Sequence, residues 1–572
     1  MNAKRLLDLY DRVADAPDAI AGLRRFVLDL AVRGKLVEQD PTDEPASELL
    51  VRIAAEKARL VQEGKFKTFE GALDRDADAF AFELPINWSW CYLDDLAGVA
   101  RGGSPRPIKS FITDDPEGIP WIKIGDSTRG SIYIDQTQER IMPEGLAKSR
   151  LVIPGDLLLS NSMSFGFPYI TNVEGCIHDG WLVIRTPDGL IDKLYLHKVF
   201  LSDHAKAAFS EAASGAVVQN LNADKARQLP VPLAPLAEQQ RIVAKVDELM
   251  ALLDWLETAR TAREATRDRL AAASLARLTA PETEAEDFPA HARFVLDALP
   301  ALTARSDQIK QLRQTILNLA VRGKLVKQDL VDEPASELLK RIAAEKARLL
   351  RAGEIKKKAA KDPEIVGATH ELPESWCWVS LGTAFLYDAG AKCEPKLLNP
   401  SLWLLELEDI EKETGRLLAR IAVTDRESKS TKSKFHPGDV LYGKLRPYLT
   451  KVLVADEPGY STTEIVAIRP YIPLCSEYCA LALRRPDFMD YVTRLGQGTK
   501  MPRLRTEDAV VSPFPLPPLA EQRRIVAKVD QLMALLDRLE ASLATADITR
   551  QRLLKALLHE ALTPDEKREA AA

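Results

Sequence analysis

The stretch LAVRGKLV, residues 30–37, decides the architecture of this chain, because the same eight letters return at residues 319–326. Other words from the helical parts recur in the same order. They are DEPASELL (43–50 and 332–339), RIAAEKARL (52–60 and 341–349), and PLAEQ with RIVAKVD (from 235 and 241, and again from 518 and 524). This period is far longer than that of a solenoid repeat. It therefore indicates duplication of a whole helix, domain, helix unit and predicts a pseudo-twofold molecule.

Two segments between the repeated words, residues 84–232 and 372–515, are far less alike. They open on ELPINWSW (83–90) and ELPESWCW (371–378), whose paired tryptophans we expect to anchor a core. Short β-rich runs broken by Gly and Pro follow, such as WIKIGD from Trp121. Each variable segment is therefore predicted to form a mixed α/β globule.

A proline-rich stretch, PVPLAPLAEQ or PFPLPPLAEQ, closes each variable segment and is expected to continue neither a strand nor a helix. Beyond it, apolar residues step by 4, 3, 4 and 3, which predicts a long helix with one apolar seam in each half. The seams are Ile242, Val246, Leu249, Leu253 and Leu256, and Ile525, Val529, Leu532, Leu536 and Leu539. Two such seams predict an antiparallel coiled coil, roughly 65 Å long for some 45 residues, that acts as a ruler. The alternative is a coiled coil that only holds subunits together.

The predicted fold class is α+β, with two mixed α/β domains joined by two long antiparallel helices in a pseudo-twofold internal repeat. The expected boundaries are an N-terminal helical region (1–82), domain 1 (83–234), a long helix (235–280), a linker and central helical region (281–370), domain 2 (371–517), and a second long helix with a tail (518–572).

Composition and charge narrow the class of protein. The 572 residues are 46% hydrophobic, and no stretch approaches the roughly 18 apolar residues of a membrane span, so we expect a cytoplasmic protein with no membrane partner. The net charge of -6 is unexpected for a chain that grips long DNA alone. Basic residues nevertheless cluster locally, although a solvated face is a common origin of such runs. They are Lys429, Lys432, Lys434, Lys444, Arg446 and Lys451, with Arg494, Lys500, Arg503 and Arg505.

Catalytic motifs are missing from the sequence. A DNA methyltransferase needs a glycine-rich cofactor loop and an Asn/Asp-Pro-Pro-aromatic tetrad, whereas the nearest strings are RGGS at 101–104 and NPSL at 399–402. There is no P-loop, and the seven histidines form no ligand-like pair. We therefore predict a chain with no catalytic residues, no metal and no cofactor of its own.

Recognition residues emerge when the two domains are aligned by the offset of 283 residues that relates the PLAEQ words. Asn161 then falls opposite Lys444, Asn220 opposite Arg503, and Asn222 opposite Arg505. Because asparagine pairs bidentately with adenine and arginine with guanine, such exchanges would give two domains different base preferences. The alternative is that the asparagines cap a turn while the arginines contact phosphate or solvent.

With these words in place, the chain resembles the specificity subunit of type I restriction-modification systems over nearly its full length. The resemblance implies two target-recognition domains, each binding one half of a split, asymmetric site in double-stranded DNA. It also implies two methyltransferase subunits that use S-adenosylmethionine on adenine, and restriction subunits that use ATP and Mg for translocation and cleavage.

The resemblance and the alignment together give two sets of candidate residues. Those expected at DNA are Ser104, Lys123, Asn161, Ser162, Asn220, Asn222, Lys444, Arg446, Tyr448, Lys500, Arg503 and Arg505. Those expected to dock partner subunits are Arg33, Lys35, Arg52, Arg322, Lys324 and Arg341. Two rival readings remain: a self-contained enzyme with unfamiliar motifs, and a coiled-coil scaffold whose variable domains bind proteins.

Overall fold

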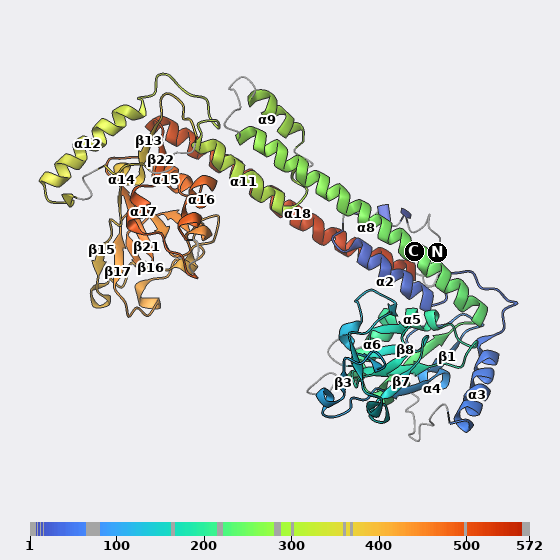
Figure 1. The fold of residues 1–572 in the computed structure, drawn as a ribbon. Helices are drawn as coiled ribbons and strands as arrows, with labels where there is room; N and C mark the ends of the chain where they lie inside the picture. Colours follow the sequence, from blue (N-terminus) through green and yellow to red (C-terminus); the bar gives the residue numbers. More distant parts are fainter. Residues whose placement is uncertain are drawn as a thin grey trace. The chain divides into compact units, whose positions relative to one another are not determined.

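The chain folds into two compact units, and each of the two long helices begins in one unit and ends in the other. The computed structural model describes residues 7–562 except 9, 12, 15, 65–79, 162–165, 214–220, 280–287, 299–301, 358–361, 366–369 and 497–499. Unit 1 comprises Met1–Ala262 and Ala546–Ala572, and unit 2 comprises Arg263–Thr545. Helix α8 (Leu236–Thr279) begins in unit 1 and ends in unit 2, whereas α18 (Leu519–Leu562) does the reverse (Figure 1). Each has 44 residues, so the predicted pair of long helices that join two domains is confirmed.

Domain 1, within unit 1, is a mixed α/β globule, as predicted. Its strands form a two-stranded sheet β1-β12 and two five-stranded sheets in the orders β3-β6-β4-β10-β7 and β2-β11-β8-β9-β5. The strands are β1 (Ser89–Tyr92), β2 (Gly98–Arg101), β3 (Ile112–Thr113), β4 (Ile119–Ile122), β5 (Tyr133–Ile134), β6 (Glu139–Ile141), β7 (Arg150–Val152), β8 (Leu157–Ser160), β9 (Pro168–Thr171), β10 (Gly175–Ile177), β11 (Trp181–Arg185) and β12 (Pro230–Leu233). The other helices of unit 1 are α2 (Ala19–Val32), α3 (Ala46–Gln62), α4 (Leu93–Leu96), α5 (Lys193–Leu201), α6 (Asp203–Ala213) and α7 (Ala223–Arg227).

Domain 2, within unit 2, repeats this plan with fewer strands. Its sheets are β13-β22, β14-β21-β18-β19 and β15-β17-β20-β16. The strands are β13 (Cys377–Ser380), β14 (Phe385–Tyr387), β15 (Ala391–Cys393), β16 (Trp403–Leu405), β17 (Lys432–Phe435), β18 (Val440–Gly443), β19 (Val452–Val454), β20 (Gly459–Thr462), β21 (Ile465–Pro470) and β22 (Pro513–Leu516). The other helices of unit 2 are α9 (Phe288–Asp297), α11 (Ser306–Val321), α12 (Ala335–Arg351), α14 (Leu381–Ala384), α15 (Ser476–Ala482), α16 (Pro486–Leu495) and α17 (Thr506–Val510).

Each proline-rich closing stretch contains a strand, β12 or β22. The expectation that these stretches continue neither a strand nor a helix is therefore wrong for the strand. β12 pairs antiparallel with β1, and β22 pairs with β13. In β12 the prolines fall at alternate positions, Pro230 opposite Tyr92 and Pro232 opposite Trp90. Because each sheet has only two strands, the ring nitrogens can face away from the partner strand, where no donor is needed. Each domain is thus opened and closed by the same hairpin-like pair.

A buried carboxylate at the start of each long helix joins that helix to the domain that precedes it. Glu238 accepts hydrogen bonds from the indole of Trp88 at 3.0 Å and from Gln39 Nε2 at 2.6 Å. In unit 2, Glu521 accepts the same bonds from Trp376 at 2.9 Å and from Gln328 at 2.6 Å. Trp88 and Trp376 are buried, whereas Trp90 and Trp378 are half-buried, so the prediction that paired tryptophans anchor the core is confirmed for the first tryptophan of each opening word.

The two long helices pack on each other over part of their length, because Leu536 of the α18 seam lies in one cluster with Ala271, Leu275 and Leu278 of α8. Most seam residues have other partners, which the expectation of one continuous seam-on-seam contact did not include. The seam from Ile242 to Leu256 lies in one core with α2 and domain 1. Ile525 and Val529 lie in the core of domain 2, and Leu536 lies in a third cluster with α11. Each seam is therefore used mainly to attach its helix to its own domain and to the repeated helix that precedes that domain.

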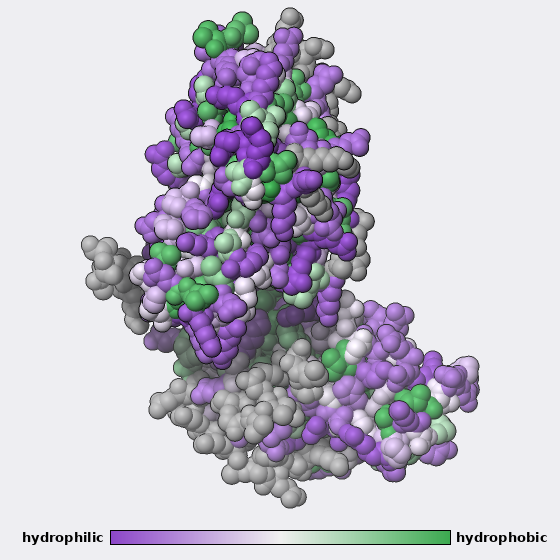
Figure 2. Space-filling view, turned by 90° about the vertical axis from the view of Figure 1, so that its left-hand side faces the viewer, coloured by the Kyte–Doolittle hydropathy of each residue, from purple (hydrophilic) through white to green (hydrophobic). Residues whose placement is uncertain are grey.

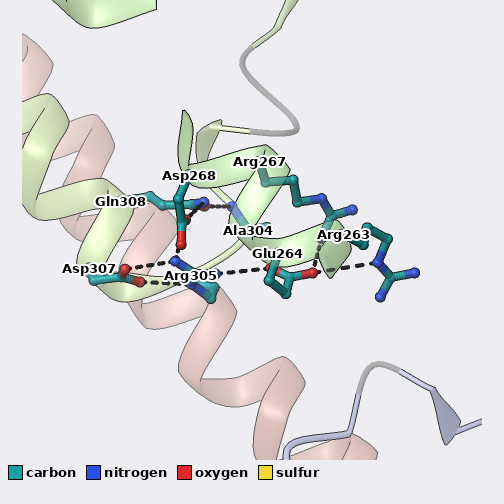
Figure 3. Close-up of polar contacts among 8 residues, drawn as sticks. All are labelled: Arg263, Glu264, Arg267, Asp268, Ala304, Arg305, Asp307 and Gln308. Atoms are coloured by element: carbon teal, nitrogen blue, oxygen red, sulfur yellow. Dashed lines mark hydrogen bonds and ion pairs between the residues drawn. The ribbon is translucent and has the colours of Figure 1, made fainter. Parts of the chain in front are cut away.

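The last turns of α18 meet the repeated helix α2 in unit 1, and those of α8 meet its copy α11 in unit 2, with different polar contacts. In unit 2, Arg305 at the start of α11 forms ion pairs with Glu264 at 2.9 Å and Asp268 at 2.5 Å of α8 (Figure 3). Both units also have an apolar cluster at this contact. In unit 1 its buried members are Val13, Ala16, Ala19, Leu554 and Leu557. In unit 2, Ala271, Leu275 and Leu278 of α8 lie with Ile309, Leu312 and Leu319 of α11. The repeat has thus kept an apolar helix contact, to which Arg305 adds ion pairs in unit 2.

The surface shows no single dominant character on the face in view, where hydrophobic residues are scattered among hydrophilic ones (Figure 2). None of the helices in the described part of the chain has both the length and the apolar content needed to cross a bilayer.

Candidate nucleic-acid interface

The two domains share one backbone arrangement at the end of their central sheet. In domain 1, Asn161 receives a bond on its carbonyl from Leu221 N and donates from its own N–H to Gly180 O, both at 2.9 Å. In domain 2, Lys444 makes the same two bonds, with Leu504 N and Glu464 O, again at 2.9 Å. We call this hydrogen-bonded rung the shared frame.

The shared frame supports the alignment made from the sequence, because Asn161 and Lys444 occupy the same place in it. One residue after the rung, Asn222 and Arg505 take the N-cap positions of α7 and α17. Asn222 Oδ1 accepts a hydrogen bond from Lys225 N at 2.8 Å, so the alternative reading of this asparagine as a cap is the one the structure favours. Arginine offers no acceptor for that role, and the Arg505 side chain is exposed.

In domain 2 the predicted residues from two distant stretches lie together. The segment 444–448 pairs with the segment 500–505 through a β-bridge between Leu445 and Arg503 and a bond from Arg446 N to Pro502 O at 2.8 Å. Arg446 has a left-handed backbone, φ 49°, just before the short 3₁₀ turn Pro447–Leu449. This turn also lies against α16. The fold therefore assembles one basic edge from residues almost sixty positions apart.

The side chains of this edge fall into two groups. Arg446, Tyr448, Lys500 and Arg505 are exposed, and Lys444 is half-buried. Arg446, Lys500 and Arg505 form no ion pair with an acid in the described part of the chain. Arg503 differs, because its guanidinium is held by Glu464 through Nε at 3.1 Å and Nη2 at 2.8 Å. We call Lys444, Arg446, Tyr448, Lys500, Arg503 and Arg505 the domain 2 edge.

The corresponding residues of domain 1 are arranged differently. For Asn161 the prediction of a DNA contact is wrong. Its side chain is fully buried, and its Nδ2 donates to Asp179 O at 3.0 Å. A side chain without exposure cannot reach a base, so we remove Asn161 from the predicted DNA contacts. Ser104 meets the same residue, donating from Oγ to Asp179 Oδ1 at 2.8 Å. Lys123 pairs with Glu139 at 2.6 Å.

Two of the predicted DNA contacts, Ser162 and Asn220, lie outside the described residues. Asp179 and Glu464 were missed by sequence reasoning. Asp179 had one signal, its place in an Asp-Gly turn just before β11. Glu464 had none, because its partner lies 39 residues away in sequence.

The basic run 429–451 does not form one face, contrary to the possibility left open by the sequence. Lys432 is buried on β17 and donates to Ser430 Oγ at 3.0 Å. Lys451 donates to the carbonyl of Leu407 at 2.6 Å. Only part of the run, at 444–446, contributes to the domain 2 edge.

Two of the predicted docking residues hold the ends of the long helices. Lys35 Nζ donates to the carbonyl of Leu562, the last residue of α18, at 2.7 Å. Arg322 Nη1 donates to the carbonyl of Thr279, the last residue of α8, at 2.8 Å. A cation at a helix C-terminus satisfies an unpaired carbonyl and interacts favourably with the helix dipole. The repeated word LAVRGKLV thus has an intramolecular role that sequence reasoning missed.

The remaining docking candidates also have partners within their own units. Arg52 pairs with Glu44 at 2.8 Å, and its repeat Arg341 pairs with Glu333 at 3.1 Å. The other two are Arg33, which lies 4.4 Å from the centroid of the Phe82 ring, and Lys324, whose pKa is lowered by burial. Exposed arginines such as Arg52 can still meet a partner, so docking stays a prediction for them.

The two domains thus carry different polar groups on one backbone frame. Residues 85–263 match the family model for the type I restriction modification DNA specificity domain. The chain is 31% identical to the type I restriction enzyme EcoAI specificity subunit of Escherichia coli and 30% identical to the EcoEI specificity subunit of the same organism. Each alignment covers 97% of this chain and 95% of the relative. The chain therefore belongs to the family of type I restriction enzyme specificity subunits.

A solved structure is also similar. The HsdS subunit of Thermoanaerobacter tengcongensis is 19% identical with a TM-score of 0.42, over 84% of this chain and 98% of that chain.

Proposed function

We propose that this protein reads a bipartite, asymmetric DNA site, with domain 1 binding one half and domain 2 the other. The observation that carries the proposal is the shared frame, which holds unlike side chains at equivalent places. Domain 2 has Glu464 and the exposed Arg505 where domain 1 has Gly180 and the capping Asn222, and the half-buried Lys444 stands in place of the buried Asn161. A constant backbone with changed polar groups is what two different base sequences require.

In this proposal the chain supplies recognition and partner subunits supply the chemistry. Two methyltransferase subunits would bring S-adenosylmethionine and modify adenine, and restriction subunits would bring ATP and Mg. The net charge of -6 supports this division, because a chain that shares the DNA with partners needs few phosphate contacts of its own. Exposed members of the repeated helices, including Arg52 and Arg341, are proposed docking residues.

The test is adenine methylation mapping in cells that express this chain with its methyltransferase partner. A split motif with one modified adenine in each half is expected. Exchanging residues 84–232 for another domain should then change one half, and exchanging residues 372–515 in a matched variant should change only the other. A continuous motif, or none, would contradict two-domain recognition and favour the scaffold reading.

We also propose that α8 and α18 set the length of the unspecific gap. Removing residues 257–263 and 540–546 together shortens each helix by about two turns, roughly 10 Å, and preserves its facing. Because DNA rises about 3.4 Å per base pair, the gap in the mapped motif should shorten by about three base pairs. Removing seven residues from α8 alone is the control, since it leaves the helices unequal. A motif with an unchanged gap after the double deletion would contradict the ruler.

A further inference from the structure

The ion pair of Glu464 and Arg503 is the feature of the domain 2 edge that simple charge attraction to DNA does not explain. Glu464 is the residue just before β21, and its main chain is fixed by the bond from Lys444 N. Arg503 is fixed in the β-bridge with Leu445. Its side chain remains 58% exposed, while that of Glu464 is 27% exposed. Both partners are thus anchored through their backbones, and the guanidinium faces solvent.

The contact geometry leaves one end of the guanidinium available. Glu464 takes the side of the group, with Oε2 accepting from Nε at 3.1 Å and Oε1 accepting from Nη2 at 2.8 Å. The two N–H bonds of Nη1 and the second N–H of Nη2 are not used by this pair. The end formed by Nη1 and Nη2 is the one that bonds to O6 and N7 of guanine. The ion pair therefore favours one rotamer of this long side chain before DNA is bound.

A phosphate contact would be served poorly by this arrangement. A carboxylate beside the guanidinium repels a phosphate and cancels much of the cation's charge. Arg446, Lys500 and Arg505 are exposed and offer their charge without such a carboxylate. Apart from the half-buried Lys444, the edge thus holds cations of two kinds: three without an acidic partner among the described residues, and one directed by an acid.

We infer that Arg503 reads a guanine in the half-site of domain 2 and that Glu464 is its positioning residue. This inference rests on the proposed function. Domain 1 has no such pair, because Gly180 takes the place of Glu464 in the shared frame. A Cβ atom at Gly180 would lie 2.1 Å from Cε1 of His178, so a larger residue there would require the His178 ring to move.

The experiment measures methylation of DNA libraries by the assembled complex, with every position of both half-sites varied. Arg503→Ala should relax one guanine position in the half-site of domain 2, lowering discrimination there roughly tenfold or more. Glu464→Gln should relax the same position by a smaller factor. In the Arg503→Ala background, Glu464→Gln should add nothing, because Glu464 acts only through Arg503. Arg446→Ala is the matched control and should weaken all sequences alike while reducing the salt dependence.

Several results would overturn the inference. Equal weakening of all sequences by Arg503→Ala would make Arg503 a phosphate contact, and an unchanged motif would show that Arg503 reads no base. An effect of Glu464→Gln that is independent of Arg503 would make Glu464 a structural residue. The half-site of domain 1 is the internal reference in every measurement, because it should stay intact if the complex has assembled. Failure of the proposed function is distinguishable from failure of this inference, because the unaltered complex would then yield no bipartite motif.

Discussion

Domain 1 and domain 2 keep the same frame bonds but bury different residues in them. Asn161 is fully buried and bonded to Asp179, whereas Lys444 at the equivalent position is half-buried beside the domain 2 edge. At the joint with the long helices the domains are alike to within 0.1 Å in their Trp–Glu bonds. The Trp–Glu contact with the long helix, here called the joint, is therefore the same in both domains. The side chains of the shared frame, here called the tips, differ. Exchanging the residues at equivalent tips should therefore have unequal effects in the two domains, whereas the same substitution at either joint should cost its own unit the same stability.

The largest effect is expected where the tips differ in burial. Asn161→Lys places a charged amine at a site without exposure and should destabilise domain 1 by roughly 3 kcal/mol or more. The reverse change, Lys444→Asn, should alter domain 2 by less than about 1 kcal/mol. Hydrogen exchange of β8 and β11 amides reports the first change, and that of β18 and β21 amides reports the second. Equal losses of stability in the two domains would contradict the difference in burial between Asn161 and Lys444.

The joints should respond alike. Glu238→Ala and Glu521→Ala each leave a buried indole N–H and an amide without their acceptor, at a cost of roughly 2–3 kcal/mol in unfolding free energy. Replacement by glutamine should cost less, because its carbonyl still accepts one of the two bonds. Urea unfolding of the full chain, followed by hydrogen exchange in each domain, measures both. A joint that tolerates alanine in only one unit would contradict the view that the two are equivalent.

The smallest effect concerns one letter that differs inside the repeated helices. Burial, then the charge of Asp203, raises the pKa of Asp29 to about 6, against the opposing Arg33 and Lys206. The repeat has Asn318 at this position, and its Oδ1 accepts from Arg322 Nε at 2.8 Å. Arg33 Nε is buried and has no hydrogen-bond acceptor among the described residues. Asp29→Asn should therefore remove a charge that burial disfavours while keeping one acceptor oxygen, as Asn318 does in the repeat.

The sign of the pH dependence follows from the raised pKa. The folded state holds more protons than the unfolded state between about pH 4 and pH 6, so stability falls as pH rises through that window. Asp29→Asn should stabilise unit 1 by about 1 kcal/mol at pH 7, since the site is partly exposed, and give little gain at pH 4. Thermal unfolding at the two pH values measures this, with Asn318→Asp as the control of opposite sign. An equal gain at both pH values would exclude the carboxylate charge as the cause.

Much of the architecture could be predicted because its signals are local or repeated. The 3.6-residue periodicity gave both long helices, and the opening words gave a buried tryptophan in each domain. The alignment by an offset of 283 residues placed Asn161 opposite Lys444 and Asn222 opposite Arg505, in agreement with the shared frame. The partners of the seams were not predicted, because an apolar stripe does not specify which apolar surface covers it.

The candidate site was only partly predictable. The sequence brought out the residues of the domain 2 edge, but Asn161 was included although it is buried, and Glu464 was overlooked. Burial depends on which segments cover a residue, and an ion pair depends on side chains that meet across the fold. Neither is encoded in the neighbouring letters.

By itself the sequence determined that this protein is a duplicated unit with two unlike domains on two equal helices, because repetition and periodicity are written along the chain. Tertiary structure alone decided the rest. It made the proline-rich stretch a strand by giving it a single partner, set Lys35 and Arg322 on the ends of the long helices, and turned Arg503 toward solvent on the support of Glu464. Each of these depends on contacts between distant segments, which exist only once the chain has folded.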